Sequence, residues 1–487
     1  MLTTEHFWDM QMKLTFNITP LSLSLTVEKV GIFHSRMKKL FVLILVMLTS
    51  CIACKINHDS QYWAKTFGGD EKDYAEFTKQ TSDGGYIVTG YTESFGAGDP
   101  DFWILKLQSN GDVTWQKTYG DSDWDISNAI IETSDISYIV VGMTQSFGAG
   151  GFDVWILNLD QNGNILWQRT YGGSSSDWAY SVQQTSDGEY IIGGYTSSFG
   201  IGKIDLWILK ITDTGNISWQ KTYGGSEDDF ISSVQQSSDE GYIVTGYTKS
   251  FGAEASDIWV LKLESNGDVS WQKTYGRRDY EDFNSSIQET SDGGYILTGY
   301  TYLNSLGEGH IWVSKFNSNG AVMWEKTYEG NDKDYPYSIQ QTFDATGNDT
   351  GYIIASHTTA NDTRATTPCD ISLLKLGTTG NISWQKTYRL GIWSNPSYVQ
   401  QSTDGGYIIT GYTQSFSGEA LILKVDNNGD IPNCEIINES NFLAFDTSFI
   451  VKDSNCTIQS TDAIINETNV LPRDSSAEIT TICEGDN

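Results

Sequence analysis

The stretch YSVQQTSDGEYIIGGYTSSFGIGKIDLWILKITDTGNISWQKTYGG (180–225) is the clearest copy of a unit that recurs along most of this chain. The tryptophan in its W-x-K-T-Y ending marks the period. It occurs every 52 residues from Trp63 through Trp115, Trp167 and Trp219 to Trp271, and again at Trp324 and Trp384. A fixed period of this length predicts an architecture built from repeated structural units.

Each copy divides into four short strands. In the quoted copy they are residues 180–185, 189–196, 205–211 and 216–223. The first two are joined by S-D-G-E, or S-D-G-G in other copies, where Asp-Gly suits the positive φ angles of a tight hairpin. Four antiparallel strands in about 50 residues predict one blade of a β-propeller.

The number of blades follows from counting first strands, which begin near Glu76, Asn128, Tyr180, Ile231, Asn284, Tyr337 and Tyr398. The seventh copy lacks its fourth strand. It runs into I-P-N-C (431–434), and Pro432 has no N–H for a strand ladder. A fourth strand without a blade, QYWAKTF, stands at 61–67. We therefore predict an all-β fold, a seven-bladed propeller over 61–431 closed by strand 61–67.

This pattern resembles the repeat-containing β-propellers of bacterial surface and secreted proteins. Within each copy, a segment such as LDQNGNILW (159–167) also resembles the tryptophan-docking motif of quinoprotein-type propellers. That resemblance implies that the indole packs on the neighbouring blade. Quinoprotein propellers usually have eight blades, so the likeness concerns packing alone, and we assign these tryptophans a structural role.

The N-terminal region predicts export. Residues 37–50 combine Lys38 and Lys39 with the apolar run 40–48, which is too short to span a bilayer and is typical of a signal peptide. The following L-T-S-C resembles the bacterial lipobox, which implies cleavage before Cys51 and a lipid on its thiol. We interpret residues 1–36 as an extension from an upstream start codon and 51–60 as a tether.

Composition limits the partners. The formal net charge of −32 argues against nucleic acid, whose phosphates require Lys and Arg. The cysteine spacing predicts no zinc site. Residues 432–487 are predicted to form a small β-rich or semi-ordered appendage. One disulfide there is expected, but its pairing among Cys434, Cys456 and Cys483 stays open.

The face most suited to function is the one that carries the second-to-third-strand loops and the blade-joining loops, here called the loop face. Ten residues after each fourth-strand tryptophan stands a carboxylate, and the seventh copy has Ser394 instead. This acidic ring comprises Asp73, Asp125, Asp177, Asp229, Glu281 and Asp334. It suits either a rim that binds calcium or a polyol, or carboxylates that each accept N–H groups in their own loop. We favour the second, because a side chain needed in every blade is usually structural.

A second acidic series precedes the third strands, at Asp101, Asp153, Asp205, Asp257 and Asp370. His310 replaces its fifth member. A single active site requires unlike residues, and the departures from the repeat cluster in copies five to seven. Arg277, Arg278 and His310 are therefore the asymmetric candidates for a site.

These features predict a non-catalytic lipoprotein outside a bacterial membrane, at the outer membrane or cell surface. It would be a propeller scaffold that recognises a glycan, a peptide or an envelope protein. We predict no cofactor, and calcium at the acidic ring is the alternative. Two alternatives stay open: a carbohydrate-active hydrolase or lyase on the loop face of blades five to seven, and a scaffold for envelope assembly. No nucleophile, phosphate-loop or paired-carboxylate motif decides between them.

Overall fold

The computed structural model describes residues 16–19, 22–25, 61–252, 256–276, 280–303, 309–330, 333–359, 369–390, 393–414, 418–434, 436–439, 443–446, 450–453, 457–460, 464–467, 473–474 and 478–484. The chain divides into two compact units, Met1–Asp59 and Ser60–Asn487. In the first, β1 (Phe16–Thr19) pairs antiparallel with β2 (Ser22–Leu25). The expected signal segment 37–50, the tether 51–60 and Cys51 lie outside the described residues.

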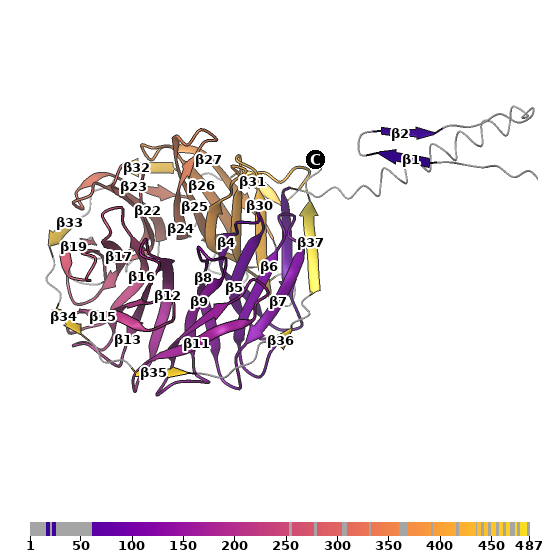
Figure 1. The fold of residues 1–487 in the computed structure, drawn as a ribbon. Coiled ribbons are helices and arrows are strands. Elements are labelled where there is room, and N and C mark those ends of the chain that lie inside the picture. Colours follow the sequence, from indigo (N-terminus) through magenta and orange to yellow (C-terminus); the bar gives the residue numbers. More distant parts are fainter. Residues whose placement is uncertain are drawn as a thin grey trace, which may run out of the picture. The chain divides into compact units, whose positions relative to one another are not determined.

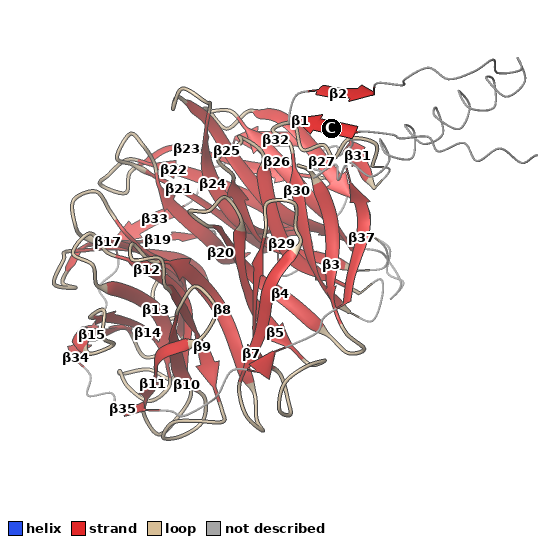
Figure 2. Ribbon diagram, turned by 45° about the vertical axis from the view of Figure 1, so that its right-hand side comes forward, coloured by secondary structure: helices blue, strands red, loops and turns tan. Residues whose placement is uncertain are grey.

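The second unit confirms the predicted propeller. Its described residues form strands and turns with no helix, and the strands make seven antiparallel sheets around one centre (Figures 1 and 2). From the inside outward, blade 1 has β4 (Asp73–Gln80), β5 (Tyr86–Thr92), β6 (Asp101–Leu107) and β7 (Val113–Tyr119); blade 2 has β8 (Asp125–Glu132), β9 (Tyr138–Thr144), β10 (Asp153–Leu159) and β11 (Ile165–Gly172); blade 3 has β12 (Asp177–Gln184), β13 (Tyr190–Thr196), β14 (Asp205–Ile211) and β15 (Ile217–Gly224).

The later blades repeat this order with longer strands in blades 5 and 6. Blade 4 has β16 (Asp229–Gln236), β17 (Tyr242–Thr248), β18 (Asp257–Leu263) and β19 (Val269–Gly276); blade 5 has β20 (Tyr280–Glu289), β21 (Tyr295–Leu303), β22 (Gly309–Phe316) and β23 (Val322–Glu329); blade 6 has β24 (Lys333–Phe343), β25 (Asp349–Thr359), β26 (Cys369–Leu376) and β27 (Ile382–Tyr388); blade 7 has β28 (Ser394–Gln401), β29 (Tyr407–Thr413), β30 (Glu419–Val425) and β3 (Trp63–Gly68).

The ring is closed by the N-terminal strand, as the sequence predicts. β3 pairs antiparallel with β30, from Trp63 opposite Lys424 to Phe67 opposite Ala420. Blade 7 thus combines strands from both ends of the repeat region. No blade at this seam is left with an unpaired third strand, because the strand missing after residue 430 is supplied from before blade 1.

Neighbouring blades are joined by the tryptophans that set the period. Trp115 Nε1 donates to Gln161 O of the next blade at 2.9 Å, and Tyr119 Oη donates to Gly163 O at 2.6 Å. Gly163 has φ +72°, and a Cβ there would lie 2.9 Å from the Trp115 ring. Only glycine therefore fits this turn, for its conformation and for the closeness of the indole. The repeated N-G is a docking point for the preceding blade.

The core lies between blades rather than within one. Third strands are buried on both faces: every residue of β14 is buried, including Trp207. Each apolar cluster joins two blades, such as Phe102 and Ile104 of blade 1 with Val140 and Trp155 of blade 2. A strand buried on both faces needs a continuous apolar run, which explains sequences such as L-W-I-L in place of an alternating pattern.

The C-terminal tail adds a fifth, outermost strand to every blade. Figure 1 shows its short strands at the rim, in yellow. In chain order they join blades 6, 5, 4, 3, 2, 1 and 7: β31 (Ile437–Glu439), β32 (Leu443–Asp446), β33 (Ile450–Asp453), β34 (Thr457–Ser460), β35 (Ile464–Glu467), β36 (Arg473–Asp474) and β37 (Glu478–Glu484). The segment treated in the sequence analysis as a β-rich or semi-ordered appendage therefore forms a belt around the propeller.

The belt has a period of its own. The residues opposite the threonine of each K-T-Y, R-T-Y or K-T-F are seven positions apart: Asn438, Phe445, Lys452, Gln459, Asn466, Arg473 and Thr480. The chain therefore advances by one blade for every seven residues, a length of about 23 Å when it is extended. The register also places Glu439, Asp446 and Asp453 opposite Lys386, Lys326 and Lys273.

Two further facts concern the described residues. Cys434, just before the belt, is disulfide-bonded, and Cys369 is a buried free cysteine. No helix in the described part of the chain is long and apolar enough to cross a bilayer.

Candidate ligand-binding site

The acidic ring lies inside the blade joints. Asp73 is fully buried, and its carboxylate accepts the Gly69 N–H at 2.8 Å, the Ser94 hydroxyl at 2.7 Å and the Thr92 hydroxyl. Asp177 accepts the equivalent three bonds in blade 3. Each of these carboxylates therefore fastens the loop that enters its own blade. These bonds support the structural interpretation of the ring.

The ring position in blade 5 is occupied by Asp282 rather than by Glu281. Asp282 pairs with Thr301 as Asp229 pairs with Thr248, and its N–H donates to Ser256 O at 2.9 Å. Glu281 faces Tyr302 instead. The stretch from the fourth-strand tryptophan to the ring position is one residue longer here than in the earlier blades. Counting ten residues from Trp271 therefore selects Glu281 instead of Asp282. In blade 7, Ser394 Oγ donates to Thr413 Oγ1 at 2.9 Å.

The second acidic series lies directly beside the ring. Asp153 is buried and accepts the Ala149 N–H at 2.8 Å. Burial, and secondly the charge of Asp177, raise the pKa of Asp153 to about 6. Asp205 has the same surroundings beside Asp229 and a pKa also of about 6. Two carboxylates thus meet at a blade joint, but the described residues contain no group of three or more acidic, thiol or imidazole side chains placed to hold a metal ion.

Of the three asymmetric candidates, His310 alone lies among the described residues. Arg277 and Arg278 lie outside the described residues. His310 lies near the start of β22, opposite Thr301, in the position of the second acidic series, and is half-buried. His310 is not among the described residues that line the pocket in blades 5 to 7.

An aromatic collar surrounds the loop-face mouth of the centre. It is made by the residue after each ring position and by the residue opposite it in the second strand, and comprises Tyr74, Tyr91, Trp178, Tyr195, Phe230, Tyr247, Phe283, Tyr300, Tyr335, His357 and Tyr412. Ring contacts continue from blade to blade, with centroids 4.2 Å apart for Tyr74 and Tyr412 and 5.2 Å for Tyr300 and Tyr335. Blade 2 interrupts the collar with Ile126 and Met143.

A pocket of ≈ 500 Å³ opens beside the collar in blades 5 to 7. Its described lining consists of Tyr300, Lys333, Tyr335, Pro336, Tyr337, His357 and Trp393. Trp393 is 42% exposed, and its carbonyl accepts the Gln414 N–H at 2.7 Å, which ties the indole-bearing backbone to the end of β29. The pocket therefore offers open aromatic surface held on rigid strands.

His357 supplies a polar atom within this aromatic surface. It is 8% exposed, and its ring centroid lies 4.8 Å from Tyr335 and 5.6 Å from Tyr337. Burial lowers its pKa to about 4, so the imidazole is neutral at physiological pH. Among the described residues its Nδ1 has no hydrogen-bond partner. A neutral imidazole both donates and accepts, which suits a hydroxyl group of a ligand.

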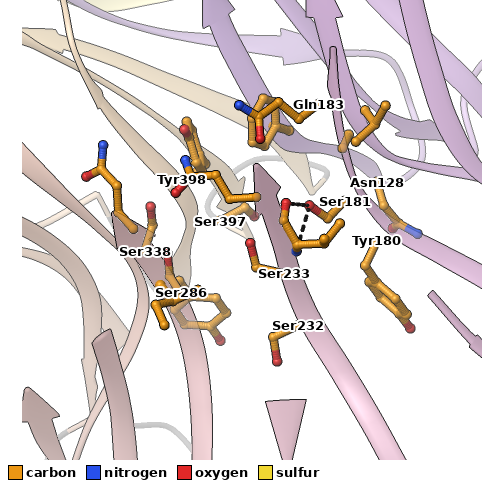
Figure 3. Close-up of a pocket in the computed structure, with 18 of the residues that line it drawn as sticks. Asn128, Tyr180, Ser181, Gln183, Ser232, Ser233, Ser286, Ser338, Ser397 and Tyr398 are labelled. Atoms are coloured by element: carbon orange, nitrogen blue, oxygen red, sulfur yellow. Dashed lines mark hydrogen bonds between the residues drawn. The ribbon is translucent and has the colours of Figure 1, made fainter. Parts of the chain in front are cut away.

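The centre of the propeller is a polar channel. Its cavity of ≈ 370 Å³ is walled by the first strands of the blades, with Asn128, Ser181, Gln183 and Ser338 among the residues labelled in Figure 3. Glu76 and Lys79 of β4 also line it. Burial raises the pKa of Glu76 and lowers that of Lys79.

Comparisons with known proteins add little. No protein-family model matches the chain, and no curated protein matches it. Among solved structures, a protein described as an exo-β-1,3-galactanase from Bifidobacterium bifidum s17 matches at 13% identity and a TM-score of 0.28, covering 50% of this chain and 85% of that one. The β-1,2-mannobiose phosphorylase of Listeria innocua matches at 13% identity and a TM-score of 0.28, covering 59% of this chain and 91% of its own. Likenesses this weak carry no argument about function.

The collar and the pocket escaped the sequence analysis. The signal was present, because an aromatic residue follows the ring aspartate at Tyr74, Trp178, Phe230 and Tyr335. It was hidden because alternate residues of a strand face opposite sides, and only the register shows which of them reach the mouth.

Proposed function

We propose that this protein is a non-catalytic recognition module whose loop-face pocket binds carbohydrate. The observation that carries the proposal is one pocket that combines open aromatic rings with a neutral, unpartnered imidazole nitrogen. Sugar rings present flat C–H faces, which pack on aromatic rings, and hydroxyl edges, which need partners that donate and accept. Binding sites for small ligands commonly combine apolar walls with a few such polar groups.

The setting is the cell envelope. The lipobox-like L-T-S-C and the preceding apolar run support export and a lipid on Cys51, with the propeller held outside a bacterial membrane, at the outer membrane or cell surface. A tether of about ten residues reaches roughly 33 Å when extended, so the loop face would have access to envelope or extracellular glycans.

A second candidate is a carbohydrate-active hydrolase or lyase at the same place, and the pocket's position in blades 5 to 7 favours it. Glycoside hydrolysis usually employs a pair of carboxylates on either side of the scissile bond. The described lining of the pocket contains none. Catalysis would therefore depend on residues outside the described part. An envelope-assembly scaffold, the third function, would instead be shown by a co-purifying membrane protein.

The test is binding of the full-length protein to an array of bacterial-envelope and plant glycans. We expect Tyr335→Ala and Trp393→Ala to weaken binding at least about tenfold, because each removes a stacking surface. Trp124→Ala is the matched control, since Trp124 is 47% exposed and occupies the position of Trp393 in blade 2, away from the pocket.

Equal losses in all three variants, or no glycan bound by the unchanged protein, would contradict carbohydrate recognition at this pocket. Captured glycans should also be recovered intact after long incubation. Shortened products would establish the hydrolase or lyase in place of the non-catalytic module.

A further inference from the structure

The pocket and the channel are neighbours that share one lining residue. Tyr337, near the start of β24, lines both cavities and is 36% exposed. A ligand that stacks in the pocket therefore lies next to the side chain that also borders the polar centre. The two cavities differ in chemistry, since the pocket is mainly aromatic and the channel wall is mainly hydroxyl and amide.

The channel wall holds a polar group that lacks a partner. Ser338 is 2% exposed and lines the channel, and its Oγ has no hydrogen-bond partner among the described residues. A buried hydroxyl left without a partner has lost the hydrogen bonds that it makes in water, so a site that retains one is suited to a ligand that satisfies it. In contrast, Ser181 exchanges hydrogen bonds with Val234 across the blade joint, at 3.2 and 3.3 Å (Figure 3).

The glutamines of the wall are oriented by the fold. The side-chain oxygen of Gln183 accepts the Gln236 N–H of the next blade at 2.7 Å, and that of Gln288 accepts the Gln341 N–H at 2.6 Å. An amide held by its oxygen has its NH₂ group left as donor. The wall thus presents amide donors together with hydroxyls that do both, which is the complement of a sugar's hydroxyl groups.

The size and charge of the channel restrict the ligand. A cavity of ≈ 370 Å³ lies at the small end of the range of roughly 300–1,000 Å³ for small-molecule sites, so it has room for a single sugar residue rather than for a polymer strand. The described lining of the channel contains one acidic residue, Glu76, and one basic residue, Lys79, so their formal charges cancel. A neutral polyol is favoured over an ion.

We infer that the channel is a second subsite, which takes the terminal sugar residue of a neutral glycan whose next residues stack on Tyr335 and Trp393. This inference rests on the proposed function and adds that the module recognises chain ends. A terminal residue carries a hydroxyl that an internal residue has lost to its linkage. Ser338 would bind this hydroxyl in the polar interior of the channel.

The experiment is saturation-transfer NMR of the full-length protein with free glucose, galactose, mannose and N-acetylglucosamine at millimolar concentration. We expect transfer to at least one of them, weakened about tenfold in affinity by Ser338→Ala, since Ala removes only the hydroxyl and adds no bulk to the channel wall. Ser233→Ala, at the equivalent wall position of blade 4, is the second variant and should weaken the same sugar. Unchanged melting midpoints would show that both variants fold.

The outcomes separate this inference from the proposed function. Transfer to none of the four sugars, or transfer that both serine variants leave intact, overturns the channel subsite. If Tyr335→Ala then still abolishes array binding, carbohydrate recognition at the pocket stands without it. If Tyr335→Ala has no effect on the array either, both fail.

Discussion

Replacing Asp153 by asparagine should stabilise the propeller more at alkaline pH than at acidic pH. The quantity compared at each pH is the unfolding free energy of the variant minus that of the unchanged protein. The carboxylate of Asp153 is buried beside that of Asp177, and its pKa is about 6 instead of the ordinary 3.8. A raised folded-state pKa means that the folded chain holds this proton more tightly than the unfolded chain does. The corresponding stability is fully present below pH 3.8 and is lost as the pH rises through 6.

The magnitude follows from the two pKa values. A pKa of about 6 against 3.8 corresponds to about 3 kcal/mol of unfolding free energy in total, of which about 2.4 kcal/mol is lost between pH 4 and pH 8. Asparagine has an oxygen that can still accept the Ala149 N–H, and it carries no charge to bury. The variant therefore escapes most of this loss, and Asp205→Asn should behave alike.

The assay is urea unfolding at pH 5, 6, 7 and 8. The unfolding free energy of Asp153→Asn minus that of the unchanged protein should rise by about 1.4 kcal/mol across this range, most of it between pH 5 and pH 6. Asp213→Asn, an exposed turn residue, is the control and should give a flat difference. A flat or falling difference for Asp153→Asn would refute the reasoning, because it would mean that the carboxylate pair is not held under strain at neutral pH.

Three further predictions test other parts of the fold. Gly163→Ala should lower the unfolding free energy by about 2–4 kcal/mol, more than Gly188→Ala does. Gly188 also has a positive φ, +85°, but an added Cβ there would have nothing within 4 Å. Equal losses would show that docking of the indole is unimportant. Calcium should not change the melting midpoint, whether or not Asp125→Asn and Asp229→Asn are present; a rise with calcium that the double variant abolishes would establish the acidic ring as a metal site. Removal of residues 436–487 should lower the midpoint and cause association, because it exposes the outer edge of every blade; a monomer with an unchanged midpoint would contradict this.

The fold was predictable because its signal is repeated. Trp115 and the N-G turn that receives it are both visible in the sequence, and their period reports the geometry of a blade joint. The closure by 61–67 followed from an excess strand at one end and a missing strand at the other, which is an argument about unpaired edges rather than about any local propensity.

The candidate site was less predictable because it depends on register. Counting from Trp271 selected Glu281, whereas one extra residue in the preceding joint moves Asp282 into the ring. The neutrality of His357 depends on burial by neighbours that are distant in the sequence. Neither effect leaves a mark in the local sequence.

The belt was overlooked because its strands are short. Its signal is an acidic residue at five of the seven positions spaced by seven, Glu439, Asp446, Asp453, Glu467 and Asp474, with Ser460 and Thr481 at the other two. That period has meaning only once the distance between blade edges is known.

The belt also gives the chain a mechanical property. β3 is held on both sides, by β30 along one edge and by β37 along the other. A load applied along β3 from the N-terminal side is therefore shared by two ladders, whose hydrogen bonds lie across the direction of pull and have to break together. Because β37 is the last segment of the belt, the same load passes on to the outer strands of the other blades. If the protein is attached at its N-terminus and a ligand pulls on its loop face, the force on β3 is carried by the whole ring of blades rather than by one terminal strand.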